Sequence, residues 1–269
     1  MIEARPRMGS PSEAETGAIL AGKVAVVTGG ASDIGGAIAK AFANQGCRLV
    51  LAGRRRVPLE EVAHEVEGLA VPCDVSVEAD VVGLMRACDE AYGRLDVLVN
   101  NAGTSGAFVN AEDMDVAAWD TTFAVNLRGV ALCIKHGIPL LKRQGGSIVN
   151  MSSLIGLKGY PMRSDYAASR FAVIGVTQSV AQELGPLGIR VNALCPGAVV
   201  GQRMRTTLAE RARKEGRTQE DIIKSDYTDT AALRKWVTPD DVAAAALFLA
   251  SDAASATTGE ALRVDAGRA

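Results

Sequence analysis

Tyr166 and Arg170 stand four residues apart in the segment YAASR, which the sequence pattern predicts to be helical. At that spacing two side chains lie on the same face of a helix and can point into one cleft. A tyrosine hydroxyl can donate or accept a proton if a nearby cation lowers its pKa from about 10 towards working pH. The pair therefore predicts general acid/base chemistry at an oxygen, as a ketone reduced by hydride requires.

A glycine-rich segment, TGGASDIGG, follows the apolar run KVAVVT and opens a helix. Glycines let the backbone approach a pyrophosphate, and the helix N-terminus offers it N–H groups and a partial positive charge. Gly53 stands where an NAD-binding chain would have a carboxylate for the ribose 2′-hydroxyl, and Arg54 and Arg55 follow it. Unless these arginines are simply solvated, they favour a 2′-phosphate, so NADP(H) is the predicted cofactor and NAD(H) stays possible.

Short apolar runs alternate with longer helix-like segments along most of the chain. The runs are KVAVVT, RLVLAG, LAVPCDV, LDVLVNNAG, GSIVNMSS, IRVNALCPG and ALRVDAG; helices are expected from about residue 34, from about residue 58, up to Tyr92, and over 116–143, 164–185 and 239–251. Such runs are typical of strands buried on both faces of a parallel sheet. The pattern predicts an α/β fold, a Rossmann-type doubly wound parallel sheet of about seven strands with helices on both faces.

Two segments depart from this alternation. Residues 1–20 are rich in Pro, Gly, Ser and Glu and are predicted to be a flexible tail, so that residues 21–269 form one dinucleotide-binding domain. Residues 198–235 are polar, charged and too long for a plain connector. Insertions of this size are often lids or disordered segments, and their apolar residues favour a folded substrate lid.

Composition excludes several classes of protein. The net charge of -2 provides no basic excess for a nucleic acid, and the first twenty residues contain no apolar stretch long enough for a signal sequence or a membrane span. No membrane partner is expected. The five cysteines are scattered, which argues against disulfides and favours a cytoplasmic location. His64 and His136 have no second ligand at metal spacing, so no metal site is expected. A small-molecule partner is predicted.

The chain resembles the short-chain dehydrogenase/reductase family from about residue 22 to residue 267. Thr28, Gly29 and Gly35 match its TGxxxGxG motif, and the other matching features follow at the family's spacing. These are NNAG at 100–103, Asn126 in FAVNLRG, Ser153, the YxxxR pair Tyr166 and Arg170, and the turn Cys195-Pro196-Gly197.

The resemblance implies a role for each matching residue in an enzyme that interconverts a secondary alcohol and a ketone or aldehyde. Tyr166 would transfer the proton, Ser153 would hydrogen-bond the substrate oxygen, and Asn126 would hold a water that links the cation to solvent. Arg170 would assist Tyr166 and reach the nicotinamide ribose. The residues implied to bind the cofactor are Thr28, Gly29, Ser32, Asp33, Ile34, Arg54, Asp74, Val75, Asn101, Ala102, Gly103, Tyr166, Arg170, Pro196, Gly197 and Val199. A homo-oligomer, dimer or tetramer, is expected through the segments 116–143 and 164–185.

Three positions depart from the family pattern. Asp33 replaces the middle glycine, Arg170 replaces the lysine of YxxxK, and Gly201 stands where a threonine often contacts the nicotinamide. Weaker cofactor binding and slower turnover are the expected consequences, because arginine does not readily release a proton. Two alternatives remain open: a halohydrin dehalogenase, which uses Ser, Tyr and Arg without the cofactor, and a nucleotide-binding sensor without catalysis.

Overall fold

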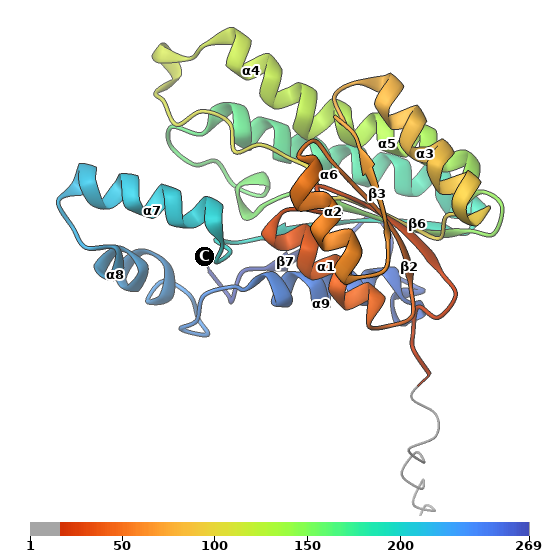
Figure 1. The fold of residues 1–269 in the computed structure, drawn as a ribbon. Helices are drawn as coiled ribbons and strands as arrows, with labels where there is room; N and C mark the ends of the chain where they lie inside the picture. Colours follow the sequence, from red (N-terminus) through yellow and green to blue (C-terminus); the bar gives the residue numbers. More distant parts are fainter. Residues whose placement is uncertain (1–16, 269) are drawn as a thin grey trace, which may run out of the picture.

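The computed structural model describes residues 17–268, except for the side chains of Arg203, Glu210 and Lys214. These residues form one sheet of seven parallel strands in the order β3-β2-β1-β4-β5-β6-β7 (Figure 1). The strands are β1 (Val24–Thr28), β2 (Arg48–Gly53), β3 (Leu69–Pro72), β4 (Val97–Asn100), β5 (Gly146–Met151), β6 (Ile189–Pro196) and β7 (Ala261–Val264). The predicted doubly wound fold is confirmed.

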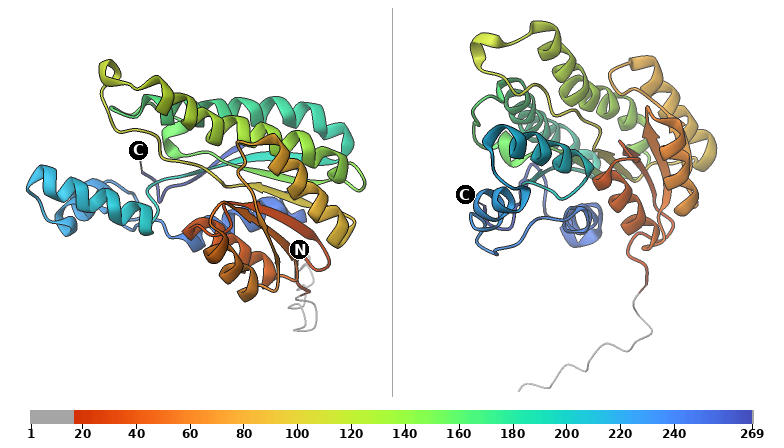
Figure 2. Two further views of the ribbon diagram at one scale, coloured as in Figure 1. Left: turned by 45° about the horizontal axis from the view of Figure 1, so that its top comes forward. Right: turned by 60° about the vertical axis from the view of Figure 1, so that its left-hand side comes forward.

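Helices cover both faces of the sheet (Figure 2). One core lies under α1 (Asp33–Ala43), α2 (Arg56–Glu65) and α9 (Pro239–Ala250). The other lies under α3 (Glu78–Tyr92), α5 (Gly129–Leu141) and α6 (Ser164–Leu184). Successive β1 side chains point to opposite faces, so Ala25 and Val27 enter the first core and Val24 and Val26 the second. This is why β1 reads as an unbroken apolar run.

The order of the strands reverses between β1 and β4. The chain runs outward from β1 to β3 on one side and from β4 to β7 on the other. In open α/β sheets such a switch leaves a crevice at the carboxyl ends of the two central strands, where ligands bind. The glycine-rich turn follows β1 and the NNAG segment follows β4, so both predicted cofactor segments lie at this crevice.

Two predicted boundaries are wrong. The segment 116–143 is not one helix, because α4 (Val116–Phe123) and α5 are separated by a π-helical turn, η2 (Ala124–Arg128). π-helical turns insert an extra residue and often occur at functional sites. The predicted flexible tail ends too late, since the Leu20 side chain is fully buried in the first core and its N–H donates to the Gln45 carbonyl. Residues 1–16 of that tail lie outside the described residues.

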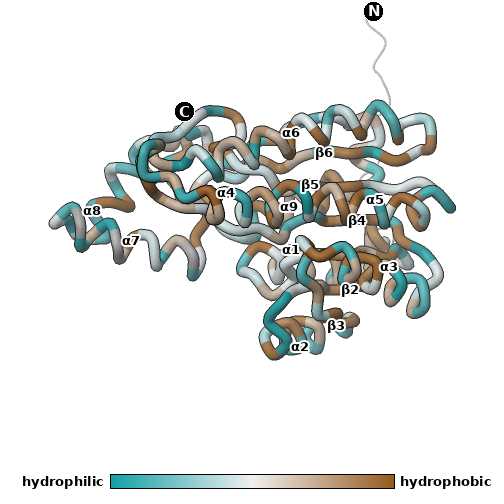
Figure 3. The backbone as a smooth tube through the Cα atoms, turned by 90° about the horizontal axis from the view of Figure 1, so that it is seen from above, coloured by the Kyte–Doolittle hydropathy of each residue, from teal (hydrophilic) through white to brown (hydrophobic). Residues whose placement is uncertain are grey.

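The segment predicted as a lid is helical over much of its length. It contains α7 (Gln202–Glu215), α8 (Gln219–Ile222) and the π-helical turn η5 (Ile223–Thr228). Leu208 and Ile222 are buried, as the prediction of a folded insertion requires. Figure 3 shows α7 and α8 projecting from the body of the molecule beyond the sheet. Its action as a lid stays a prediction.

All five cysteines are buried and free, so we predict that the folded protein resists thiol reagents. Burial raises the pKa of the Cys47, Cys73, Cys88 and Cys133 thiols to about 12, and it raises that of Cys195 as well. Since the thiolate is the reactive form, labelling at about pH 8 should be negligible before unfolding and complete after it. Fast labelling of the folded protein would contradict the burial.

Candidate active site

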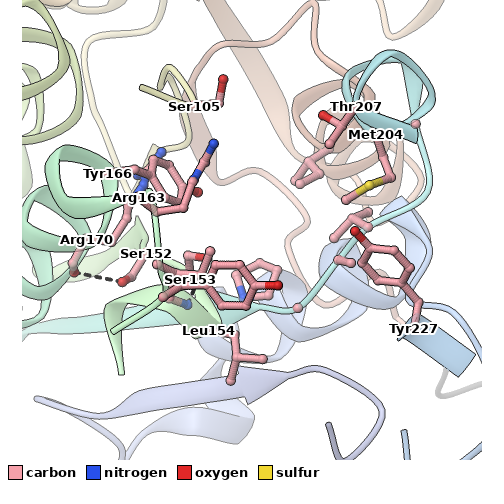
Figure 4. Close-up of a pocket in the computed structure, with 18 of the residues that line it drawn as sticks. Ser105, Ser152, Ser153, Leu154, Arg163, Tyr166, Arg170, Met204, Thr207 and Tyr227 are labelled. Atoms are coloured by element: carbon pink, nitrogen blue, oxygen red, sulfur yellow. Dashed lines mark hydrogen bonds between the residues drawn. The ribbon is translucent and has the colours of Figure 1, made fainter. Parts of the chain in front are cut away.

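A cavity of about 480 Å³ opens at the carboxyl ends of the central strands. Its walls are the turn after β1, Asn101 after β4, the segment 151–155 at the end of β5, the segment 196–201 at and after β6, and side chains of α6 and α7. Figure 4 shows Tyr166, Arg163 and Arg170 on one side of it, with Met204, Thr207 and Tyr227 on the other. Both predicted ends of the site, the glycine-rich turn and the Tyr166 helix, therefore line one cavity.

The glycine-rich turn is tied to the NNAG segment by side-chain hydrogen bonds. Thr28 Oγ1 accepts from the Asn101 and Ala102 N–H groups at 3.0 and 3.1 Å, and Asn101 Nδ2 donates to the Thr28 and Gly29 carbonyls. Ser32 caps α1, its Oγ accepting from the Gly35 N–H at 3.0 Å. Thr28, Ser32 and Asn101 therefore shape the turn, while the backbone N–H groups of α1 remain the part suited to a pyrophosphate.

Gly29 and Gly35 are required by close contact of the backbone with itself. Gly29 has φ +66°, in the left-handed region that favours glycine. A Cβ at Gly35 would lie 2.1 Å from the Gly29 carbonyl oxygen, so no other residue fits there. The turn thus fits a pyrophosphate at the start of α1, with Ile34 at the cavity wall. One residue of the turn does not suit a pyrophosphate: Asp33, whose negatively charged side chain belongs to a residue that lines the same cavity.

Arg54 and Asp74 lie together at the ends of β2 and β3. Arg54 Nη1 is 3.9 Å from Asp74 Oδ2, and the Arg54 side chain is 70% exposed. Burial alone would raise the pKa of the Asp74 carboxyl, but hydrogen bonds from Ser76 and the charge of Arg54 outweigh it and lower the pKa. Val75, also predicted to bind cofactor, is buried in the second core. Neither Arg54 nor Asp74 is among the described residues that line the cavity, so their predicted contact with the cofactor stays a prediction.

Two guanidinium groups lie close to the Tyr166 ring. Arg170 Cζ is 5.1 Å and Arg163 Cζ is 4.7 Å from the ring centroid. Arg170 is 3% exposed, and its Nη1 donates to the Met151 carbonyl at 2.6 Å. Its buried Nε has no hydrogen-bond partner within the described residues. A buried guanidinium therefore lies over the Tyr166 ring.

Ser153 lies at the end of β5 beside these groups. It caps the short turn η3 (Leu154–Gly156), where its Oγ accepts from the Ile155 N–H at 3.2 Å, and its own hydroxyl proton can be donated into the cavity. The neighbouring Ser152 Oγ donates to the Arg170 carbonyl at 2.9 Å. Ser152 therefore fixes α6 to the end of β5, which holds Ser153, Tyr166 and Arg170 in one group.

The Asn126 side chain forms hydrogen bonds to other groups of the protein. Its Oδ1 accepts from the Thr104 N–H at 2.8 Å, and its Nδ2 donates to the Thr104 carbonyl and to Ser169 Oγ. Asn126 is fully buried and is not among the described residues lining the cavity. Its side chain fixes the loop after Gly103 to α6, and its predicted role of holding a water stays a prediction.

Gly103 lies against the Arg170 guanidinium. A Cβ on Gly103 would be 2.3 Å from Arg170 Nη2 and 3.1 Å from Asn126 Oδ1. A side chain at this glycine of NNAG would therefore displace the guanidinium from its present position, a constraint the sequence did not reveal.

The segment after β6 forms the wall predicted to face the nicotinamide. Pro196, Gly197 and Val199 line the cavity, and Val199 pairs with Val237 in an isolated parallel bridge. The Val200 N–H donates to the Val237 carbonyl at 2.9 Å. This pairing fixes the position of the segment that lines the cavity.

Asp165 is a site residue that sequence reasoning missed. Its carboxylate is 4% exposed and accepts from the Tyr166 N–H, from the Ala107 N–H at 2.9 Å and from Thr122 Oγ1 at 3.0 Å. It joins the start of α6 to α4 and to the loop that borders the cavity. An acidic residue in the first turn of a helix, next to Tyr166, was the available signal.

A network of charges holds the projecting segment together. Burial alone would raise the pKa of the Asp226 carboxyl, but hydrogen bonds from Arg217, Ser225 and Arg211 outweigh it and hold the pKa well below its ordinary value. A carboxyl with a lowered pKa stabilises the fold above its ordinary pKa, and this stabilisation is lost as the pH falls through the lowered value.

We predict that Asp226→Asn makes residues 202–228 sensitive to proteases at neutral pH, whereas the parent segment resists until strong acid. Limited proteolysis across a pH series measures this. Asp229→Asn, which removes an exposed carboxylate directly after this segment, is the matched control and should change nothing. Equal resistance of the Asp226 and Asp229 variants would contradict the prediction.

Two searches of the described residues are negative. Within residues 17–268 no group of three or more His, Cys, Asp or Glu side chains is placed to hold a metal ion. No helix in that part of the chain is long and apolar enough to span a membrane.

Comparisons with known proteins agree with one another. The family model described as enoyl-(acyl carrier protein) reductase matches residues 29–269. The chain is 35% identical over 254 residues to D-beta-hydroxybutyrate dehydrogenase of Rhizobium meliloti (strain 1021), covering 91% of this chain and 98% of the relative. It is 37% identical over 254 residues to D-threitol dehydrogenase of Mycolicibacterium smegmatis, covering 92% and 93%.

Two solved structures are also similar. Levodione reductase superposes with a TM-score of 0.84 at 32% identity, covering 92% of this chain and 97% of the other. NAD+-bound xylitol dehydrogenase gives a TM-score of 0.86 at 29% identity, covering 92% and 99%.

Proposed function

The chain belongs to the short-chain dehydrogenase/reductase family, and on that premise we propose that the cavity is the active site of a nicotinamide-dependent oxidoreductase. Its reaction interconverts a small-molecule secondary alcohol and the corresponding ketone. The observation that carries this proposal is the lining of one cavity by the glycine-rich turn at one end and by Ser153, Tyr166 and Arg170 at the other.

The proposed mechanism assigns the proton to Tyr166. A bound nicotinamide supplies or accepts the hydride. Ser153 Oγ donates a hydrogen bond to the substrate oxygen. During reduction the Tyr166 hydroxyl gives that oxygen its proton and becomes a phenolate, and during oxidation the Tyr166 phenolate accepts the proton of the alcohol. The Arg170 guanidinium, held by the Met151 carbonyl, stabilises negative charge on the phenol oxygen and is within the group that would hold the nicotinamide ribose.

We propose NADP(H) as the preferred cofactor because Arg54 stands at the end of β2 without a carboxylate at Gly53. Asp74 is the nearby acidic group, and the 3.9 Å separation is too long for a strong ion pair with Arg54. The guanidinium can therefore turn to a 2′-phosphate.

We predict that Arg54→Ala weakens NADPH binding about tenfold and leaves NADH binding unchanged, because one exposed charged hydrogen bond to the 2′-phosphate is lost. Fluorescence titration with each dinucleotide measures both constants. Arg56→Ala is the matched control, since Arg56 is paired with Glu60 at 2.8 Å on the outside of α2. An equal loss of affinity for NADH and NADPH would contradict a contact with the 2′-phosphate and would mean that Arg54 supports binding of either dinucleotide.

The same titration, followed by a panel of ketones and alcohols, tests the proposed function. The proposal expects dinucleotide binding and oxidation or reduction of at least one substrate. Absence of dinucleotide binding would contradict it, binding without turnover would favour the sensor, and halide release from a vicinal halohydrin would favour the dehalogenase. A single catalytic domain with a lid at about 198–235, a homo-oligomer and a cytoplasmic location remain part of the proposal.

A further inference from the structure

Asp33 connects the two walls of the cavity. It lies in the first turn of α1, and its Oδ2 accepts a hydrogen bond at 2.8 Å from the N–H of Gln202, the first residue of α7. Asp33 and Gly201 both line the cavity. A carboxylate at a helix N-terminus is favourable because the unsatisfied N–H groups there carry partial positive charge. The contact therefore fastens the projecting segment to the glycine-rich turn.

Gly201 makes this contact possible. A Cβ at Gly201 would lie 2.3 Å from Asp33 Oδ2 and 2.9 Å from its Cγ. The backbone of Gly201 is extended, with φ 165°, so its conformation alone does not require glycine. Two departures from the family pattern thus have one cause, because the Asp33 carboxylate occupies the space into which a side chain at position 201 would extend.

The carboxylate also lies where a dinucleotide must bring negative charge. Asp33 is at the N-terminus of α1, the part of the turn suited to a pyrophosphate, and like charges at short range oppose each other. We propose that the Asp33 carboxylate acts as a latch: in the free protein it holds the N-terminus of α7 on the glycine-rich turn. A bound pyrophosphate displaces this carboxylate from the Gln202 N–H. Cofactor binding is then coupled to release of the α7 N-terminus. This inference rests on the proposed dinucleotide site.

The latch is tested first in the free protein, by amide hydrogen exchange over residues 199–206. Asp33→Ala removes the acceptor, and Gly201→Ala pushes it away. Each should raise exchange at the Gln202 amide about tenfold, and the double variant should show no further increase because both changes break one contact. Asp240→Ala, which removes a carboxylate from the first turn of α9, is the control and should leave this segment unchanged. Unchanged exchange in Asp33→Ala would overturn the latch.

The displacement is tested by titration with NADPH and NADH. Asp33→Ala should bind both about tenfold more tightly than the parent, equivalent to about 1.4 kcal/mol. NADPH should accelerate exchange at Gln202 in the parent and have no such effect in Asp33→Ala. Faster exchange in the free variant with unchanged affinity would overturn the displacement while leaving the proposed function intact. If neither the parent nor Asp33→Ala bound NADPH or NADH, both the displacement and the proposed function would be overturned. The contact between Asp33 and α7 would still be tested by hydrogen exchange in the free protein.

Discussion

Tyr166→Phe should lower kcat by roughly 10²- to 10⁴-fold, the usual contribution of a positioned general acid or base. Phenylalanine keeps the ring that lies 4.7 Å from the Arg163 guanidinium and 5.1 Å from that of Arg170, so only the hydroxyl is lost. The dissociation constants of NADPH and NADH should stay within about twofold, since the proposed role of the hydroxyl is in the chemical step and the ring is kept. Steady-state kinetics and fluorescence titration measure the two effects.

Tyr160→Phe is the matched control for that experiment. Tyr160 lines the same cavity but is 49% exposed and lies outside the group formed by Ser153, Tyr166 and Arg170. Its variant should keep a kcat close to that of the parent. Comparable losses in the two variants would show that the cavity, rather than the Tyr166 hydroxyl, is sensitive to substitution.

Arg170→Met should lower kcat about 100-fold or more. Among the described residues, the Arg170 guanidinium is the buried cation that lies over the Tyr166 ring, and its loss removes stabilisation of negative charge on the phenol oxygen. The substitution also leaves the Met151 carbonyl without its Arg170 donor. Thermal unfolding therefore accompanies the kinetics, and a folded variant with parental kcat would exclude Arg170 from the mechanism.

Arg170→Lys separates charge from the guanidinium itself. Lysine keeps the cation and can release a proton, so turnover equal to or faster than that of the parent is expected. The space beside Gly103 that holds Nη2 would be empty in this variant. The Arg170 Nε has no hydrogen-bond partner within the described residues, so its loss breaks no hydrogen bond there. Collapse of activity in this variant would mean that the site is fitted to the guanidinium.

The fold was predictable because strands buried on both faces read as apolar runs between helix-like segments. The interruption of the helix over 116–143 was less predictable. The π-helical turn η2 around Asn126 has a pattern of apolar residues that does not differ from that of α4 and α5. Leu20 was placed in the tail because the residues before it are polar, whereas it is buried in the first core, whose other residues all come later in the chain.

The residues of the site were predictable where spacing along one element brings them together, as for Tyr166 and Arg170 on α6. Contacts between distant segments were not. Asp165 joins three elements, and the bond from the Gln202 N–H to Asp33 spans 169 positions. The sequence identified Asp33 and Gly201 as separate departures from the family pattern. Only the structure showed that the Asp33 side chain occupies the space that a side chain at position 201 would need.

The most direct test of the account is transfer of a label from cofactor to product. A ketone that the enzyme reduces is incubated with NADPH or NADH carrying deuterium at the transferable position of the nicotinamide ring, and the alcohol is analysed by mass spectrometry. The account predicts one deuterium on the carbon that bears the new hydroxyl, formed rapidly by the parent and far more slowly by Tyr166→Phe. An alcohol formed without the label, or at equal rates by both proteins, would contradict it.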